Sequence, residues 1–213
     1  MDRFDKSISA SGGTNTFEQY FANLPVSACQ VGSEKKTVLI TLTAVTGAST
    51  RNPGTHMAVA ADGSSTGSFS GGCIEAAVVA EALDVLESGK SRETRFGAGS
   101  PYLDIRLPCG GGIDLFFTPI SSPEVIEDIF NRVERRKPVA ITLDCESDDI
   151  GCTAHSKQQG AVERSGSHVL VHHIPAARLN ILGHGPSVES LVNLATSYGI
   201  DCAILSPDPA VID

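Results

Sequence analysis

The sequence predicts an α/β fold, with a mixed-sheet α/β domain over residues 15–176 and the start of a Rossmann-like domain, a single βαβ unit, over residues 177–213. Three observations support this class. Runs of β-branched and apolar residues such as TVLITLTAV (37–45) are typical of strands. Two stretches carry apolar residues at helical spacing. The last part of the chain reads strand, glycine turn, helix, strand.

The first half of the chain alternates predicted strands with glycine-rich loops and contains one clear helix. Ile74, Val78 and Val85 recur at helical spacing, and Gly89 is the expected end of that helix. A shorter helix is expected after Thr16, in FEQYFANL. The predicted strands are TVLITLTAV (37–45), MAVA (57–60) and TGSFS (66–70).

The second half has the best-marked helix of the chain, SSPEVIEDIFNRVERRK (121–137). Ser122 is its expected cap, and Pro123 suits its first turn. We expect the polar, turn-rich stretch 144–167 to be a loop or a solvent-exposed hairpin. The predicted strands are TRFG (94–97), YLDIRL (102–107), IDLFFTPI (113–120), PVAITL (138–143) and SHVLVHHI (167–174).

The predicted βαβ unit resembles part of a nucleotide-binding fold. Gly183 and Gly185 allow a tight turn close to a phosphate, at the start of a helix that could hold an anion. However, Val188 occupies the third glycine position, and Ser206 stands where an acid would bind the ribose. A nicotinamide- or nucleotide-binding oxidoreductase or regulator that uses NAD(P) is therefore the alternative interpretation. One βαβ unit cannot cover both faces of its sheet, so we expect a truncated chain or a homodimer.

Composition excludes several classes of protein. A net charge of −9 argues against binding a nucleic-acid backbone, which requires clustered Lys and Arg. The first residues have no apolar signal core, and no stretch is apolar enough for a membrane span. We therefore expect a cytoplasmic protein whose six cysteines include free thiols rather than a disulfide framework.

Two cysteines lie in glycine-rich loops and are the strongest candidates for chemistry. Cys73 stands at a predicted helix start, where the helix dipole and unpaired N–H groups would favour a thiolate. Cys109 follows a predicted strand, so both loops can emerge at the same edge of the sheet. The alternative is that both are buried structural cysteines. The glycines beside them are Gly71, Gly72, Gly110 and Gly111.

Other metal or redox sites find little support in the sequence. His168 and His172 share a face of a predicted strand, but they have no third ligand at a spacing typical of zinc sites. No pair of cysteines has CxxC spacing, which excludes zinc ribbons and thioredoxin-like motifs. The two glycine-flanked cysteines therefore remain the main candidates.

These motifs resemble the XdhC/CoxI family, whose members bind molybdenum cofactor and help install it in xanthine dehydrogenase and related hydroxylases. The resemblance rests on LTAVTGASTRNPGTHMAVAADGSSTGSFSGGCIEAAV, then RFG, then LPCGGGIDLFFTPI and GHGPSVESL. It implies an N-terminal α/β domain followed by a Rossmann-type domain, most of which this chain would lack. It also implies a chaperone that protects the cofactor, assists its sulfuration and delivers it to an apo molybdenum hydroxylase.

The resemblance assigns roles to individual residues. It implies that Cys73 and Cys109 handle the cofactor and ligate its metal, since molybdenum prefers soft sulfur ligands. Glu75 would move a proton at the thiol or sulfide, although a helix-stabilising role is an equal alternative. Arg51 would pair with the pterin phosphate, or else be a solvated loop residue. A cysteine desulfurase is the implied sulfur donor. Whether the chain itself catalyses a step stays open.

Overall fold

The computed structural model describes residues 8–10, 36–102, 107, 109–154, 160–175 and 178–206. The chain divides into two compact units: a larger one, Thr16–Ile174, and a smaller one that joins Met1–Asn15 to Pro175–Asp213. The helix expected after Thr16 and most of the strand expected at YLDIRL lie outside the described residues. The α/β class predicted from the sequence is confirmed.

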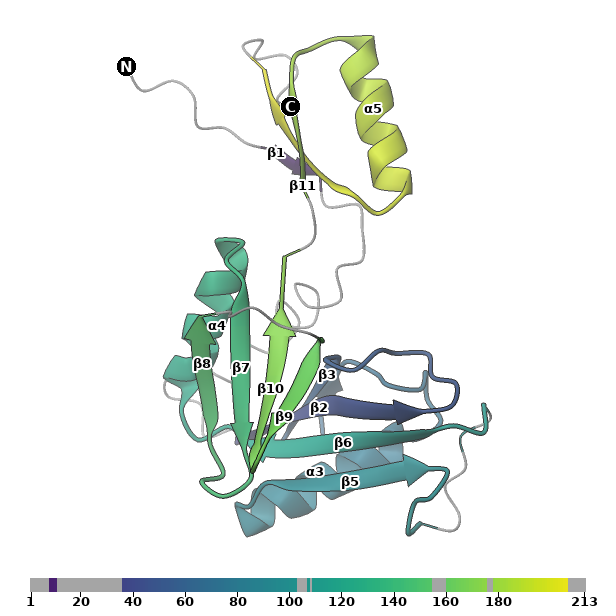
Figure 1. Ribbon diagram of the computed structural model, residues 1–213, viewed down its shortest axis with the longest axis vertical. Helices are drawn as coiled ribbons and strands as arrows, with labels where there is room; N and C mark the ends of the chain where they lie inside the picture. The colour runs from purple at the N-terminus through teal and green to yellow at the C-terminus, as the bar shows by residue number, and fades with distance from the viewer. Residues whose placement is uncertain are drawn as a thin grey trace. The chain divides into compact units, whose positions relative to one another are not determined.

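A five-stranded sheet with β2 in its middle forms one layer of the larger unit (Figure 1). Every described strand pair of this unit is antiparallel, whereas the sequence suggested a mixed sheet; short connections between strands favour antiparallel pairing. The strand expected over residues 66–70 is shorter, because residues 67–70 lead into a loop. In spatial order the strands are β4 (Ser65–Thr66), β3 (His56–Ala60), β2 (Thr37–Thr46), β6 (Gly112–Pro119) and β5 (Arg92–Gly97).

A four-stranded sheet forms the second layer. The stretch 144–167 contributes two of its strands, but they do not form the hairpin with each other that was one expectation for this stretch. Each pairs instead with the stronger strand beside it in sequence, β8 with β7 and β9 with β10, because the β-branched central strands are the better partners. The order is β8 (Ile150–Ala154), β7 (Val139–Asp144), β10 (His168–His173) and β9 (Val162–Ser165).

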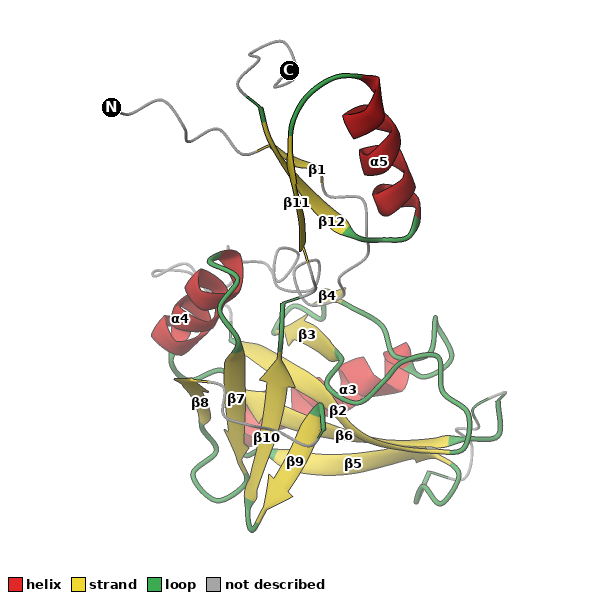
Figure 2. Ribbon diagram, turned by 45° about the horizontal axis from the view of Figure 1, so that its top comes forward, coloured by secondary structure: helices red, strands yellow, loops and turns green. Residues whose placement is uncertain are grey.

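Two helices complete the larger unit. α3 (Glu75–Ser88) covers the face of the five-stranded sheet that is turned away from the four-stranded sheet (Figure 2), and it ends at Gly89, whose φ of 69° is left-handed. α4 (Pro123–Glu134) contacts β7 and β8. Ser122 is its N-cap residue, as expected, with an extended backbone, but its side chain makes no capping hydrogen bond. None of the described helices is long and apolar enough to cross a membrane.

Alternate side chains of β2 enter two different cores. Ile40 and its neighbours at even positions pack under α3, together with Phe117 and Val78. Leu39 faces the other way, into a core shared with the four-stranded sheet and α4, where Ile129 is fully buried. Because successive strand residues point to opposite faces, one strand holds both layers together.

A pair of histidines, with His56 buried and His173 half-buried, also joins the two sheets of the larger unit. The Nε2 atoms of His56 on β3 and His173 on β10 lie 2.9 Å apart, and Nδ1 of His56 lies 2.8 Å from the hydroxyl of Thr41. Burial lowers the pKa of His56 from 6.5 to about 3. Burial, and then the charge of His56, also lower the pKa of His173. Both rings are therefore neutral at ordinary pH.

Acid is expected to weaken the larger unit over the range from pH 6.5 towards 3. Unfolded His56 binds a proton there and folded His56 does not, so the free energy of unfolding falls as the pH falls. The loss due to this residue should be about 2 kcal/mol between pH 7 and 5. Urea unfolding at a series of pH values measures it. His56→Gln should make the free energy of unfolding less dependent on pH, whereas His168→Gln, at an exposed histidine, should not change that dependence. Equal pH dependence in wild type and His56→Gln would contradict the assignment to His56.

The smaller unit contains the predicted βαβ. β11 (Arg178–Leu182) and β12 (Asp201–Leu205) are parallel neighbours, and α5 (Pro186–Ser197) packs against them. The short β1 (Ile8–Ala10) adds an antiparallel strand at the other edge of β12, which the sequence did not predict. Cys202 is fully buried in this core. Large apolar side chains stay exposed on this unit, including Leu182, Leu194 and Tyr198.

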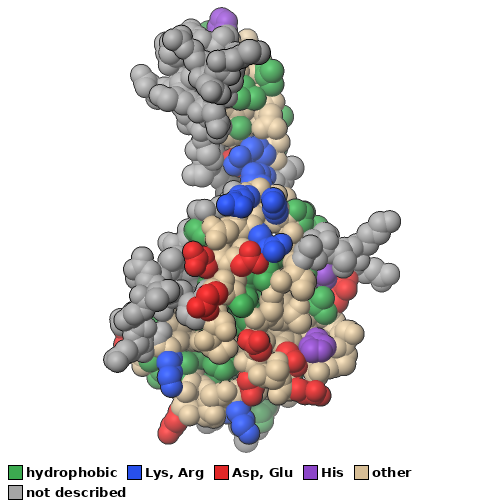
Figure 3. All heavy atoms as spheres, turned by 90° about the vertical axis from the view of Figure 1, so that its left-hand side faces the viewer, with side chains coloured by type: hydrophobic (Ala, Val, Ile, Leu, Met, Phe, Trp, Pro, Cys, Tyr) green, Lys and Arg blue, Asp and Glu red, His purple; other side chains and the backbone are tan. Residues whose placement is uncertain are grey.

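Charges of both signs are spread over the face of the larger unit that Figure 3 shows. The ion pairs of this unit include one on α4, where Arg132 pairs with Asp128 at 2.9 Å, one helical turn away. On β9, Arg164 pairs with Glu93 of β5. Proteins that bind nucleic-acid backbones instead present a uniformly basic face. This mixture fits the net charge of −9.

Candidate functional site

Cys73 and Cys109 line the same cavity in the larger unit, and both are exposed. Its volume is about 140 Å³. The lining comes from the loop after β2, the loop before α3 and the segment that leads into β6, so three parts of the chain far apart in sequence meet here. The other lining residues are Ser49, Thr50, Phe69, Ser70, Leu107 and Ile113.

Cys109 is held against the loop after β2. Its thiol donates a hydrogen bond to the carbonyl oxygen of Ala48, with Sγ and O 3.1 Å apart. Gly110, with φ of 70°, turns the chain back and donates its N–H to Leu107 O at 2.9 Å. A Cβ on Gly111 would lie 2.3 Å from Ala48 O, so only glycine allows the two loops to approach this closely.

An arginine braces the strands beneath this loop. Arg95 on β5 donates to both carboxylate oxygens of Asp114 at 2.8 and 2.9 Å. It also donates to Ala98 O at 2.7 Å and to the Thr46 hydroxyl at 2.9 Å. Its guanidinium thus ties β6, β2 and the turn after β5 together, as a planar fork with several donors is suited to do. The backbone around Cys109 therefore rests on a fixed support.

Replacing Gly111 by Ala should dislodge the Cys109 loop. The added methyl group clashes with backbone that cannot move aside, so we expect a loss of about 1–3 kcal/mol in the free energy of unfolding, together with a changed rate of Cys109 alkylation. Gly160→Ala is the control, because a Cβ there would meet its nearest atom at 3.6 Å. Unfolding curves and mass spectrometry of alkylated protein measure both effects. Unchanged behaviour in Gly111→Ala would contradict the close approach.

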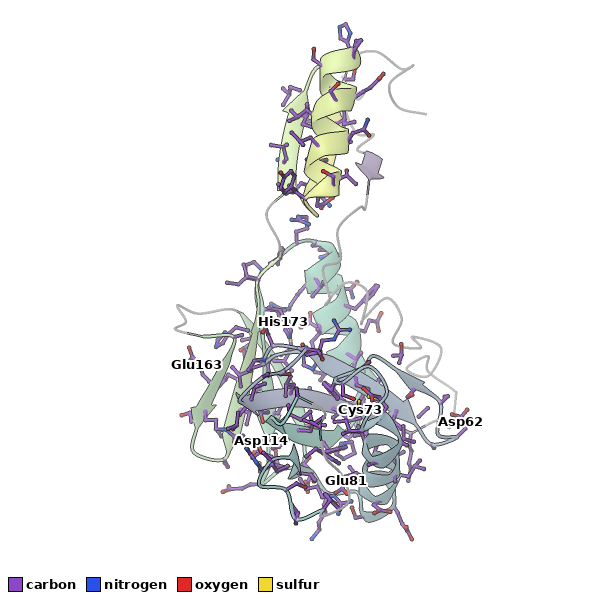
Figure 4. The ribbon with its side chains drawn as sticks, turned by 90° about the vertical axis from the view of Figure 1, so that its right-hand side faces the viewer. Asp62, Cys73, Glu81, Asp114, Glu163 and His173 are labelled. Carbon is purple, nitrogen blue, oxygen red and sulfur yellow. The ribbon has the colours of Figure 1, made fainter. Side chains whose placement is uncertain are left out.

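Cys73 lies just before α3, in the loop that carries the two other predicted glycines (Figure 4). Gly71 and Gly72 have φ of 74° and 119°, and a Cβ on either would meet nothing within 4 Å. These glycines are therefore needed for the shape of the backbone and leave open space around it. The Cys73 N–H is accepted by the Ser70 hydroxyl at 2.9 Å.

The backbone N–H groups around Cys73 all have hydrogen-bond partners, whereas the sequence predicted unpaired ones. Every N–H from Phe69 to Ile74 has a partner within its own loop or at Glu75. The partners are the hydroxyls of Ser68 and Ser70 and the carboxylate of Glu75. Stabilisation of a Cys73 thiolate by free loop donors is therefore ruled out in this conformation.

Glu75 turns its carboxylate back onto the loop. Oε1 accepts the N–H groups of Phe69 and Ser70, and Oε2 accepts those of Gly72 and Ile74. Burial raises the pKa of this carboxyl, but the hydrogen bonds from Ser70 and Ser68 outweigh burial and hold the pKa well below its usual range. These contacts favour the stabilising alternative over proton transfer. In the sequence, Ser68 and Ser70 before the two glycines indicate this arrangement, but the sequence-based prediction did not use them.

Arg51 is tied to the same loop from the other side. Its side-chain Nε donates to Ser68 O at 3.2 Å, and its backbone N–H donates to the Ser49 hydroxyl at 3.2 Å. Its neighbour Thr50 donates to Phe69 O at 2.9 Å. Arg51 thus follows two residues that line the cavity, and one of its guanidinium nitrogens is already engaged.

Gly183 and Gly185 belong to the smaller unit and are not among the residues that line the cavity. Their φ values of 145° and 91° provide the predicted turn, and Gly185 directly precedes α5. Val188, at the third glycine position, is buried in the core between α5 and the strands. The turn therefore has the expected shape.

The described residues contain no group of three or more His, Cys, Asp or Glu side chains that could hold a metal ion. A metal bound in the cavity would have two thiols from this chain. A ligand that carries further donors of its own could complete the coordination. Such a donor set suits a ligand that brings its own sulfur or oxygen donors.

Residues 31–97 match the sequence model of the XdhC and CoxI family. The chain is also 38% identical, over 178 residues, to the molybdenum cofactor insertion chaperone PaoD of Escherichia coli strain K12. The resemblance to the XdhC and CoxI family is confirmed. The match covers 84% of this chain and 55% of PaoD, so the chain spans about half the length of this curated relative.

The fold has a counterpart among solved structures. A crystal structure described as a xanthine dehydrogenase from Bacillus halodurans superposes with a TM-score of 0.60 and 19% identity. The similarity covers 85% of this chain and 61% of that chain. At this identity the likeness concerns the fold alone. Of the site residues, Arg51, Cys73 and Glu75 lie in the segment that matches the XdhC and CoxI family, and Cys109 lies beyond it.

Proposed function

We propose that this chain is a chaperone that binds molybdenum cofactor in the cavity between Cys73 and Cys109. The observation that carries the proposal is the meeting of two exposed thiols at one cavity, in a chain 38% identical to a molybdenum cofactor insertion chaperone. Molybdenum is bound by soft sulfur donors, so the residues present fit the metal end of the cofactor.

The size of the cavity indicates which part of the cofactor it takes. Pockets for whole small molecules usually have about 300–1,000 Å³. The cavity here has about 140 Å³ and apolar walls at Phe69, Leu107 and Ile113. We propose that it holds the metal end, while the pterin and its phosphate lie outside it. Arg51 is then the candidate for the phosphate, since a guanidinium suits such oxygens.

We further propose that the bound cofactor is sulfurated here before delivery. A thiolate can attack the outer sulfur of a donor persulfide and take it over while the donor cysteine leaves as a thiolate, so exposed thiols can accept sulfur by exchange. A cysteine desulfurase would supply that sulfur, and an apo molybdenum hydroxylase of the xanthine dehydrogenase type would receive the finished cofactor. Holding and handing over the cofactor requires no catalysis by this chain. The comparisons give no support to NAD(P), and we do not propose it.

Cofactor retention tests the proposal directly. Protein purified from cells that make molybdenum cofactor should contain molybdenum and pterin, measured by plasma mass spectrometry and by fluorescence of the oxidised pterin. Cys73→Ser and Cys109→Ser should fold and retain about tenfold less molybdenum, because each removes a soft ligand. Cys145→Ser, at an exposed cysteine that is not among the lining residues, is the matched control. Full retention by a folded Cys73→Ser protein would refute the role given to that thiol.

A homodimer through the smaller unit is also proposed. Leu182 and Tyr198 are each 78% exposed, and such apolar side chains favour a covering partner. Sedimentation at micromolar concentrations should give twice the chain mass. Leu182→Glu should shift the protein towards the monomer without altering its helix content. A wild-type chain that stays monomeric throughout would contradict this part.

A further inference from the structure

We propose that Glu75 is a positioning residue, whose carboxylate acts as an internal anion that holds Cys73 at the cavity. This inference rests on the proposed function, because it assigns a task at the same site. It differs from the proton-transfer role, since the carboxylate here binds backbone and does not touch a reacting atom.

The carboxylate fills a nest of donors built by the loop before α3. Oε1 accepts from Phe69 N at 3.0 Å and Ser70 N at 2.8 Å. Oε2 accepts from Gly72 N at 2.8 Å and Ile74 N at 3.2 Å. Successive N–H groups that converge on one point form a typical binding site for an anion. In this chain the anion is part of the protein.

Two serine hydroxyls link the carboxylate of Glu75 to the loop that carries Cys73. Ser68 and Ser70 each donate a hydroxyl proton to the carboxylate at 2.7 Å. The Ser70 oxygen then accepts the N–H of Cys73 at 2.9 Å. The carboxylate therefore reaches Cys73 through one hydroxyl. We call these groups, Ser68, Ser70 and Glu75, the clasp.

The geometry is not that of an ordinary helix cap. In a capping box, a Ser or Thr at the N-cap pairs with a Glu three residues into the helix. Here the N-cap is Ile74, which makes no side-chain cap, and Glu75 is the first helical residue. Its side chain therefore serves the loop in front of the helix. An acid that only complemented the helix dipole would need none of these contacts.

The clasp also fixes a second wall of the cavity. Ser68 O accepts from Arg51 Nε, and Phe69 O accepts from the Thr50 hydroxyl. The loop after β2, which Cys109 contacts through Ala48, is thereby attached to the clasped loop. Holding one loop in place thus brings the two thiols to a common space. Without the carboxylate, Gly72 would lose its side-chain acceptor, and Gly71 would keep only the Ser68 hydroxyl.

Chemical rescue tests the inference. Glu75→Ala leaves a space of carboxylate size surrounded by donors, which added formate can fill. The probe is phenylarsine oxide, which bridges two neighbouring thiols. Wild-type protein should bind one equivalent, and binding should be lost in Cys73→Ser and in Cys109→Ser. Glu75→Ala should bind at least about tenfold more weakly, and sodium formate, but not sodium chloride at equal ionic strength, should restore binding.

Glu81→Gln is the matched control for the loss of a carboxylate on α3. Glu81 contacts Thr94, Tyr102 and Arg92 and lies further along the helix from Cys73 (Figure 4). It should keep wild-type arsenical binding. If Glu75→Ala does not fold, Glu75→Gln replaces it. The amide nitrogen of Gln cannot accept the donors that converge on Oε2, so this variant should also bind the probe more weakly.

Each outcome of the arsenical-binding experiment either supports or refutes the positioning role of Glu75. Wild-type affinity in a folded Glu75→Ala or Glu75→Gln protein would overturn the inference, as would a loss in Glu75→Ala that formate does not reverse. A wild-type chain that binds no arsenical would overturn the shared site and the inference with it. The probe needs no molybdenum cofactor, so rescue by formate in a chain that retains no molybdenum would uphold the positioning role and refute the proposed function.

Discussion

The backbone N–H groups of a glycine-rich loop need acceptors, and in this chain one carboxylate supplies most of them. Gly71 and Gly72 have positive φ, and because glycine has no Cβ, these two residues do little to restrict the backbone of this loop. Glu75 supplies the missing restriction with hydrogen bonds to four N–H groups. The position of Cys73, the attachment of the loop after β2 and the shape of the cavity all depend on this arrangement.

The sheet contributes the rest of the site by delivering loops to one place. β2 runs antiparallel to both of its neighbours, so its last residues meet the first residues of β6. The close approach of Gly111 to Ala48 is possible only because neither strand end carries a bulky side chain there. The brace from Arg95 to Asp114 then fixes β5 and β6 in register under the Cys109 loop.

Much of the larger unit was predictable from local sequence. β2, β6 and α3 follow from β-branched runs and helical spacing, and the glycine-flanked cysteines stood out as candidates. The sequence did not predict that Glu75 and two serines would occupy the loop donors, because such contacts depend on where the loop turns. For the same reason the sequence located Ser122 as the N-cap of α4 but did not predict that its hydroxyl makes no capping hydrogen bond. β1 pairs with a strand some 190 residues later in the chain, a contact that local patterns cannot reveal.

The hydrogen bond from Cys109 to Ala48 makes the two thiols unequal. A metal that takes Cys109 as a ligand must first displace the proton that Ala48 O accepts, since thiols bind metals as thiolates. The sulfur would then face a carbonyl oxygen of like partial charge and have to turn away from it. Binding of a metal to Cys109 would therefore break its hydrogen bond to Ala48 O, and release of the metal would allow that bond to form again. Such an asymmetric grip would suit the proposed carrier role, because a carrier must release what it binds.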